Sequence, residues 1–126
     1  MNPYNRQYDP PAPFLDITVA NRLIRRNRLT MPALLDTGSD FTAIPHELVE
    51  RLQLYATSRI FIEDIQQQII PVFVYIVRFT MIDVIFPEIK VITTELEHAI
   101  IGRDLLNHFH IELDGRAQQA TIRGYS

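Results

Sequence analysis

Hydrophobic and polar positions along this chain follow the two-residue period of β-strands over most of its length. Near the start, Leu15, Ile17 and Val19 are spaced at this period, which is typical of a strand with one buried face. From residue 60 onward, β-branched and aromatic residues dominate, and such residues favour strands. We predict strands over residues 14–19, 29–36, 41–44, 60–65, 69–79, 84–94, 111–116 and 120–122.

Two short segments have helical spacing instead. Residues 45–52 begin with a proline, which suits the first position of a helix, and Leu48 and Leu52 lie one helical turn apart. Residues 103–109 hold three large apolar side chains at similar spacing. Many short strands with one or two short helices predict an all-β fold, a small closed β-barrel.

The length and the prolines predict the domain organisation. A chain of 126 residues fits one domain with a core of useful size. The first 13 residues contain Pro3, Pro10, Pro11 and Pro13, and proline is poorly compatible with core strands. We therefore predict a proline-rich N-terminal arm over residues 1–13 and a single domain over residues 14–126.

Composition excludes several classes of function. A net charge of −3 argues against general nucleic-acid affinity, and the one basic cluster, residues 25–28, is interpreted as a solvated turn, with an anion contact as the alternative. The chain has no cysteine, and His108 and His110 lack an evident carboxylate or cysteine partner, so we expect neither a metal nor a cofactor. Without an apolar leader or a run long enough to span a bilayer, we expect no membrane contact and a cytoplasmic location.

One run of residues concentrates the chemistry of the chain. The apolar pair Leu34-Leu35 leads directly to Asp36, and a turn with Thr37 and Gly38 follows. A strand that ends on a carboxylate holds that carboxylate at a fixed place. Because glycine has no Cβ, a backbone N–H can come close enough to donate to the carboxylate. The run therefore predicts a positioned, ionisable oxygen, and it occurs once in the chain.

Three segments taken in order carry a family resemblance: residues 34–40, residues 43–45, and Ile100-Ile101-Gly102-Arg103-Asp104-Leu105-Leu106. Together they resemble the retropepsin-like aspartic proteases, the single-domain relatives of retroviral proteases, including those encoded in bacterial genomes. The resemblance extends over residues 14–122 in order and spacing. It implies a small closed β-barrel of the retropepsin type that functions as a symmetric homodimer.

The chemistry of aspartic proteases agrees with a dimer. These enzymes need two carboxylates that share one proton, since two adjacent like charges do not both ionise easily. This chain supplies one such aspartate, so two copies of Asp36 across a two-fold axis would complete one active site. The partners implied are a second copy of the chain and a peptide or protein substrate. Residues 1–8 and 119–125 are both candidates for the strands that join the two copies.

The resemblance also implies roles for single residues. Asp36 would be the catalytic aspartate, Thr37 would brace the paired loops across the dimer axis, and Gly38 would donate its N–H to the carboxylate. Ser39, Asp40 and Arg103 would support the substrate or the dimer. We expect these last two to form a partly buried ion pair near the interface.

Family members cover the active-site cleft with a β-hairpin called the flap, whose tip is usually rich in glycine. Here the flap would carry Glu63, Asp64, Ile65 and Gln66 over the substrate, and residues 60–72 contain no glycine. Without glycine a positive φ is costlier and a tight primed turn is disfavoured. The flap is therefore expected to be wider, stiffer or held open.

Two functions follow from these features. The first is an aspartic endopeptidase, a hydrolase that cleaves extended peptide segments with a water activated between two Asp36 carboxylates. The second is a catalytically weak or inactive dimerisation or peptide-binding module with the same fold, which the glycine-free flap favours. The sequence leaves both open.

Overall fold

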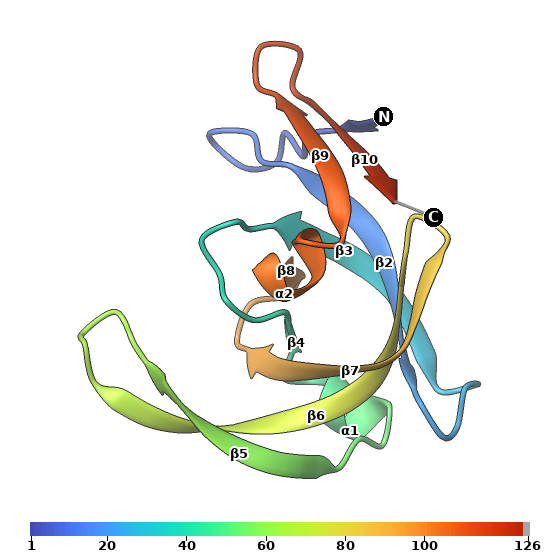
Figure 1. The fold of residues 1–126 in the computed structure, drawn as a ribbon, viewed down its shortest axis with the longest axis vertical. Coiled ribbons are helices and arrows are strands. Elements are labelled where there is room, and N and C mark those ends of the chain that lie inside the picture. Colours follow the sequence, from blue (N-terminus) through green and yellow to red (C-terminus); the bar gives the residue numbers. More distant parts are fainter. Residues whose placement is uncertain (125–126) are drawn as a thin grey trace.

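The structure, a computed structural model, describes residues 1–124. The last two residues of the predicted domain (14–126) and the last residue of the candidate joining segment (119–125) lie outside this range. Strands dominate the described residues (Figure 1). The elements in chain order are β1 (Asn2–Pro3), β2 (Phe14–Asn21), β3 (Arg28–Leu35), β4 (Ala43–Pro45), α1 (Leu48–Arg51), β5 (Ala56–Glu63), β6 (Ile69–Met81), β7 (Val84–Thr94), β8 (Ala99–Ile101), α2 (Arg103–Leu106), β9 (Phe109–Asp114) and β10 (Gln119–Gly124).

Six strands close into a barrel, which confirms the predicted fold class. The main sheet has the order β2-β3-β8-β4-β7-β6-β5, and β2 pairs with β6 as well as with β3. This second pairing joins β6 back to the first strand and leaves β5 outside the ring. Most neighbours are antiparallel, but β3 runs parallel to β8 and β4 runs parallel to β7. Closure removes the open edges that a sheet of these strands would otherwise expose.

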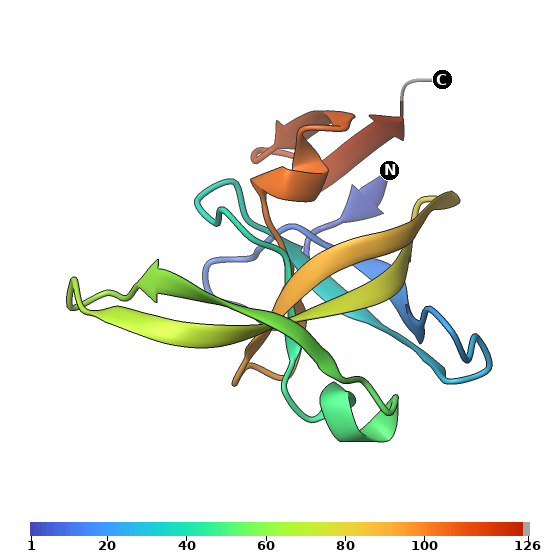
Figure 2. The same ribbon diagram turned by 60° about the horizontal axis from the view of Figure 1, so that its bottom comes forward.

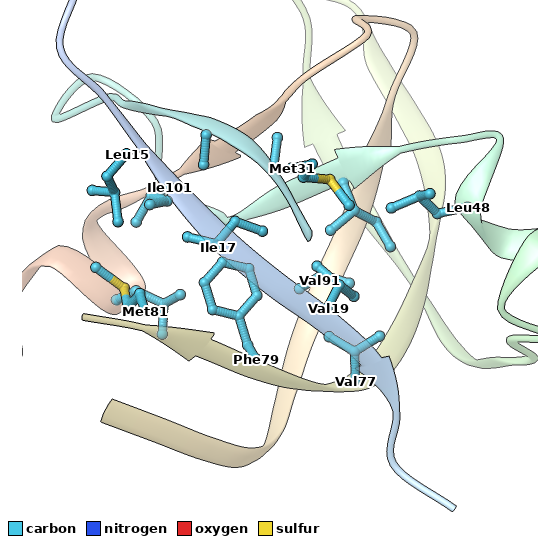
Figure 3. Close-up of a cluster of buried hydrophobic side chains, with 14 of the residues drawn as sticks. Leu15, Ile17, Val19, Met31, Leu48, Val77, Phe79, Met81, Val91 and Ile101 are labelled. Carbon is cyan, nitrogen blue, oxygen red and sulfur yellow. The ribbon is translucent and has the colours of Figure 1, made fainter. Parts of the chain in front are cut away.

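Alternation along the strands fills the barrel. Ile17 and Val19 of β2 face inward against Val77 and Phe79 of β6, and all four side chains are at most 1% exposed (Figure 3). Burial of such side chains stabilises each site by about 1.5–3 kcal/mol relative to exposure. The same period that predicted β2 from the sequence thus builds the core.

A smaller sheet lies beside the barrel and contains both ends of the described chain. Figure 2 shows this sheet near the N and C labels. Its strand order is β1-β10-β9, all antiparallel, and Asn2 is paired with Ala120. Within the proline-rich arm, Tyr8 stacks on Phe14, the first residue of β2, with ring centroids 4.8 Å apart. The arm therefore contacts both the small sheet and the barrel.

Both predicted helices are shorter than expected. Pro45 is the last residue of β4, where it pairs with Thr94 of β7, and α1 begins only at Leu48. The parallel partner strand extends β4 through the proline, and the next N–H, that of His46, donates to the Thr94 carbonyl. The second helix ends at Leu106 because Phe109 begins β9, where it joins the core cluster. None of the helices in residues 1–124 has the length and apolar composition to span a membrane.

Candidate active site

Asp36 directly follows the last residue of β3. Hydrogen bonds from the backbone at the end of β3 hold it in place. Leu35 is buried and pairs with Ile101 of β8. The Asp36 N–H donates to the Ile101 carbonyl at 3.0 Å, and the Leu35 N–H donates to the Pro13 carbonyl at the same distance. The backbone that carries the carboxylate is thus held from two sides.

The turn after Asp36 sets the orientation of its carboxylate. The Gly38 N–H donates to Asp36 Oδ1 at 2.9 Å, as its lack of a side chain led us to expect. A Cβ at Gly38 would lie 3.2 Å from the same oxygen, closer than most side chains tolerate. Thr37 and Gly38 are exposed, so this turn faces outward from the single chain.

Arg103, at the start of α2, holds the turn from the other side. Its guanidinium donates to the Thr37 carbonyl at 2.7 Å and also pairs with the Asp40 carboxylate. Its backbone N–H donates to the Ser39 carbonyl at 2.8 Å. The expected ion pair is therefore present, but its side chains are 45% and 70% exposed in the single chain rather than partly buried.

A second set of hydrogen bonds, not expected from the sequence, joins the segment after Asp40 to the start of α2. The Asp104 carboxylate accepts hydrogen bonds from the backbone N–H and the hydroxyl of Thr42, at 3.0 and 2.7 Å. Thr42 is fully buried, and its hydroxyl accepts from the Gly102 N–H at 3.2 Å. In the sequence, the only hints of this bond are that Asp104 follows Arg103 and that Thr42 lies two residues after Asp40.

Gly102 lets these two segments cross at close range. A Cβ at this position would lie 2.6 Å from both the carbonyl carbon and the oxygen of Phe41. Backbone cannot retreat as a flexible side chain can, so a side chain does not fit here. Both glycines thus allow a close contact that a side chain would disturb. Gly38 approaches the Asp36 carboxylate, and Gly102 approaches the backbone of Phe41.

The hairpin β5–β6 carries the other predicted residues at its tip. Strand β5 begins at Ala56 and ends at Glu63, so Asp64, Ile65 and Gln66 lie in the connecting turn rather than in a strand. The Asp64 carboxylate accepts from the N–H groups of Gln66 and Gln68, both at 2.9 Å. The chain therefore closes this turn with an aspartate side chain instead of a glycine.

Gln67 adopts the backbone conformation that glycine would otherwise supply. Its φ is 63°, in the left-handed region, and its N–H donates to the Asp64 carbonyl at 3.0 Å. The Asp64 N–H in turn donates to the Gln68 carbonyl at 2.9 Å. A short hydrogen-bonded turn thus forms without glycine, at the cost of a left-handed glutamine.

The predicted residues fall into two groups. Asp36 to Asp40 and Arg103 form one hydrogen-bonded cluster, whereas Glu63 to Gln66 lie at the end of a hairpin that projects from the barrel. Both views place the hairpin tip and the β3–β4 loop toward the same side of the molecule (Figures 1 and 2). An apolar hollow of about 320 Å³ lies between the hairpin base, β7 and Phe41, the residue that follows Asp40.

No protein-family profile and no curated protein sequence matches this chain. Solved structures do match. A retropepsin-like aspartic protease from Rickettsia conorii superposes with a TM-score of 0.65 at 16% identity, over 98% of this chain and 88% of that one. The chain has a retropepsin-like fold.

Two viral proteases have the same retropepsin-like fold. EIAV protease, solved in complex with an inhibitor, matches with a TM-score of 0.57 at 19% identity, over 76% of this chain and 86% of that one. Simian foamy virus (mac) protease matches with a TM-score of 0.54 at 14% identity, over 74% and 92%. At sequence identities of 14–19%, these matches show a shared fold.

Proposed function

We propose that this protein is an aspartic endopeptidase whose active site is completed by a second copy of the chain. The observation that carries the proposal is the Asp36 turn. A single carboxylate is oriented by the Gly38 N–H and braced from β8 and α2, in a fold shared with aspartic proteases. Such rigidity is what a catalytic group requires, because a misplaced reacting atom costs rate steeply.

Homodimerisation follows from the need for two carboxylates. Thr37 and Gly38 are exposed in the single chain, so two turns can meet there around a two-fold axis. Thr37 would then bond across the axis, and two Asp36 side chains would lie close enough to share a proton. The N-terminal arm and the β9–β10 hairpin, which form one small sheet, remain our candidates for the strands that join the copies.

The reaction would divide two roles between the paired carboxylates. The ionised Asp36 acts as general base on a water, and the protonated Asp36 of the other copy donates a hydrogen bond to the scissile carbonyl. Water attacks the carbonyl carbon, a tetrahedral intermediate forms, and proton transfer to the nitrogen releases the amine. The two roles require one carboxylate to be ionised and the other protonated at the same time.

An extended peptide fits the surfaces near this turn. Within residues 1–124, strand β5 is the last strand in the main sheet, so its outer edge could pair with a substrate strand. The hollow beside Phe41 is lined mainly by apolar side chains, among them Ile60, Val91 and Ile92, and would receive an apolar substrate side chain. The hairpin tip, Glu63 to Gln66, would act as the flap, and Ser39 and Asp40 would contact the substrate backbone.

Cleavage of a peptide library by the purified chain tests this function. Aspartic-type cleavage at mildly acidic pH, blocked by a statine-type inhibitor, is the expected result. Asp36→Asn should abolish it, since the amide cannot act as a base. Asp83→Asn, an equal change at an exposed turn between β6 and β7, should leave the rate unchanged. Cleavage by Asp36→Asn at the wild-type rate would overturn the proposal, and peptide binding without turnover would favour the inactive module.

A further inference from the structure

A second site lies on the outer wall of the barrel, and the proposed function makes no use of it. An open hollow of about 570 Å³ is lined by residues of β2, β3 and β6, by the turn between β2 and β3, and by Ile85 of β7. This volume is within the range of small-molecule sites, about 300–1,000 Å³. Arg25, Arg28 and Arg78 line it together with three threonines, and no acidic residue is among its lining residues.

The strand register explains why these side chains converge. Ala20 of β2 pairs with Arg28 on one side and with Arg78 on the other, so both arginines project from the same face. Their Cα atoms are separated by two strand spacings, about 10 Å. Alanine fills little of the space between them and is itself only 4% exposed, although it faces outward. Two long cationic side chains thus flank a small residue, and all three line the hollow.

The threonines form the next row of the same face. Thr18 pairs with Thr30 of β3 and with Thr80 of β6, one alternation from the Ala20 row. The Thr18 and Thr30 hydroxyls are hydrogen-bonded to each other at 2.9 Å. Hydroxyl groups can donate to an anion that the arginines attract. Arginine guanidinium groups and threonine hydroxyl groups therefore line the same hollow.

No direct ion pair neutralises the three arginines among the described residues. Within residues 1–124, none of them has a carboxylate oxygen within 4.0 Å. The nearby Arg22 differs, because it is paired with Glu88. In a chain whose net charge is −3, three converging and unpaired guanidinium groups are a local reversal of sign. Such a concentration attracts anions from solution.

We propose that this hollow, which we call the arginine hollow, binds the phosphate groups of a compact, multiply charged anion such as an oligophosphate chain. A guanidinium group can donate two parallel hydrogen bonds to two oxygens of one phosphate. Three guanidinium groups offer more donors and more positive charge than a single carboxylate can pair with. The net negative charge of the chain opposes a long nucleic acid, which would extend beyond the hollow. A small ligand avoids this repulsion.

The arginine hollow is separate from Asp36. Arg28 is the first residue of β3 and Asp36 follows its last residue, so roughly 26 Å of strand lies between them. Figures 1 and 2 place the β2–β3 turn and the β3–β4 loop toward opposite sides of the barrel. Binding at one site and cleavage at the other can therefore be measured independently.

Calorimetric titration of the full chain with inorganic tripolyphosphate, at about 0.15 M salt, tests the proposal. We expect saturable binding of one ligand per chain. Arg28→Gln and Arg78→Gln should each raise the Kd about tenfold, the effect of losing one charge-assisted interaction. Arg26→Gln removes the same charge from the same turn, but Arg26 does not line the hollow, so its Kd should change less than about twofold. Asp36→Asn should bind as the wild type does.

The ligand source is distinguished by a parallel titration with ATP. Equal affinities would indicate that the hollow binds the phosphate chain alone, and tighter ATP binding would indicate a nucleotide whose phosphates occupy the hollow. Three outcomes would overturn the proposal: no saturable binding, an Arg26→Gln effect as large as that of Arg28→Gln, or binding of single-stranded RNA without binding of tripolyphosphate.

Discussion

The backbone at Gly102 passes close to that of Phe41 in the candidate site. Phe41 directly follows the segment that holds Asp36, Gly102 lies in the later Ile-Ile-Gly-Arg-Asp segment, and a Cβ on Gly102 would lie 2.6 Å from two backbone atoms of Phe41. This contact fixes where the segment after Asp40 passes over the start of α2. The geometry of the Asp36 turn thus depends on a residue that carries no chemistry of its own.

Replacement of Gly102 by alanine should therefore be costly. We expect Gly102→Ala to lower the free energy of unfolding by about 3 kcal/mol, the upper end for an overpacked position. Gly115→Ala is the matched control, because a Cβ there meets nothing within 4 Å and no glycine of the described chain has a positive φ. Urea denaturation of both variants measures the difference. Equal stabilities would contradict the crossing.

Asp104 should matter for stability more than its exposed position suggests. Removing its carboxylate in Asp104→Ala leaves the buried Thr42 N–H and hydroxyl without their acceptor, at a cost of about 2 kcal/mol. Asp114→Ala removes one acceptor from the exposed Ala117 N–H and should cost less than about 1 kcal/mol. Thermal unfolding of the two variants makes the comparison, and a smaller loss in Asp104→Ala than in Asp114→Ala would contradict it.

Some of these residue contacts could be predicted and others could not. The Gly38 N–H bond to Asp36 was predictable, because both residues lie in one turn and glycine permits the approach. The Thr42–Asp104 hydrogen bond joins residues 62 positions apart, so it cannot be predicted from local sequence spacing. Resemblance to a family indicated the Asp40–Arg103 pair, but its exposure depends on surroundings that a single sequence does not describe.

At the scale of elements, the β5–β6 hairpin is the most informative departure from expectation. Its lack of glycine predicted a tip that is wider, stiffer or held open and disfavoured a tight turn, yet Asp64 closes a short turn with its side chain and Gln67 adopts a φ of 63°. The absence of glycine disfavours a tight turn, and the hydrogen bonds that Asp64 accepts from nearby N–H groups offset this preference. The first helix begins later than predicted for a different reason, since Pro45 pairs with Thr94 of β7 as the last residue of β4.

The left-handed residue at the hairpin tip provides a test. Gln67→Gly should stabilise the tip by about 1 kcal/mol, because glycine adopts this φ without the steric cost. Gln66→Gly should instead destabilise it by about 0.5 kcal/mol, since Gln66 has no positive φ to relieve. Hydrogen exchange of the Gln67 and Gln68 amides reports the change directly. Faster exchange in Gln67→Gly than in the wild type would contradict the assigned conformation.

At the scale of the whole molecule, the barrel depends on pairings that local patterns do not specify. Alternation predicted most strands, but β2 closes the ring by pairing with β6, and β3 reaches β8 in parallel across more than 60 residues. Register between distant strands is set by which faces can be buried together, which is a property of the assembled core. The fold class was therefore predictable, whereas the strand order was not.

The central claim also belongs to the whole molecule: one active site requires Asp36 from two copies. Mixing wild-type chain with Asp36→Asn at fixed total concentration, after subunit exchange, tests it most directly. If both carboxylates are needed, peptide cleavage falls with the square of the wild-type fraction, to about one quarter in an equal mixture. A fall to about one half, in proportion to the wild-type chain, would indicate that a single copy is sufficient and would contradict the account.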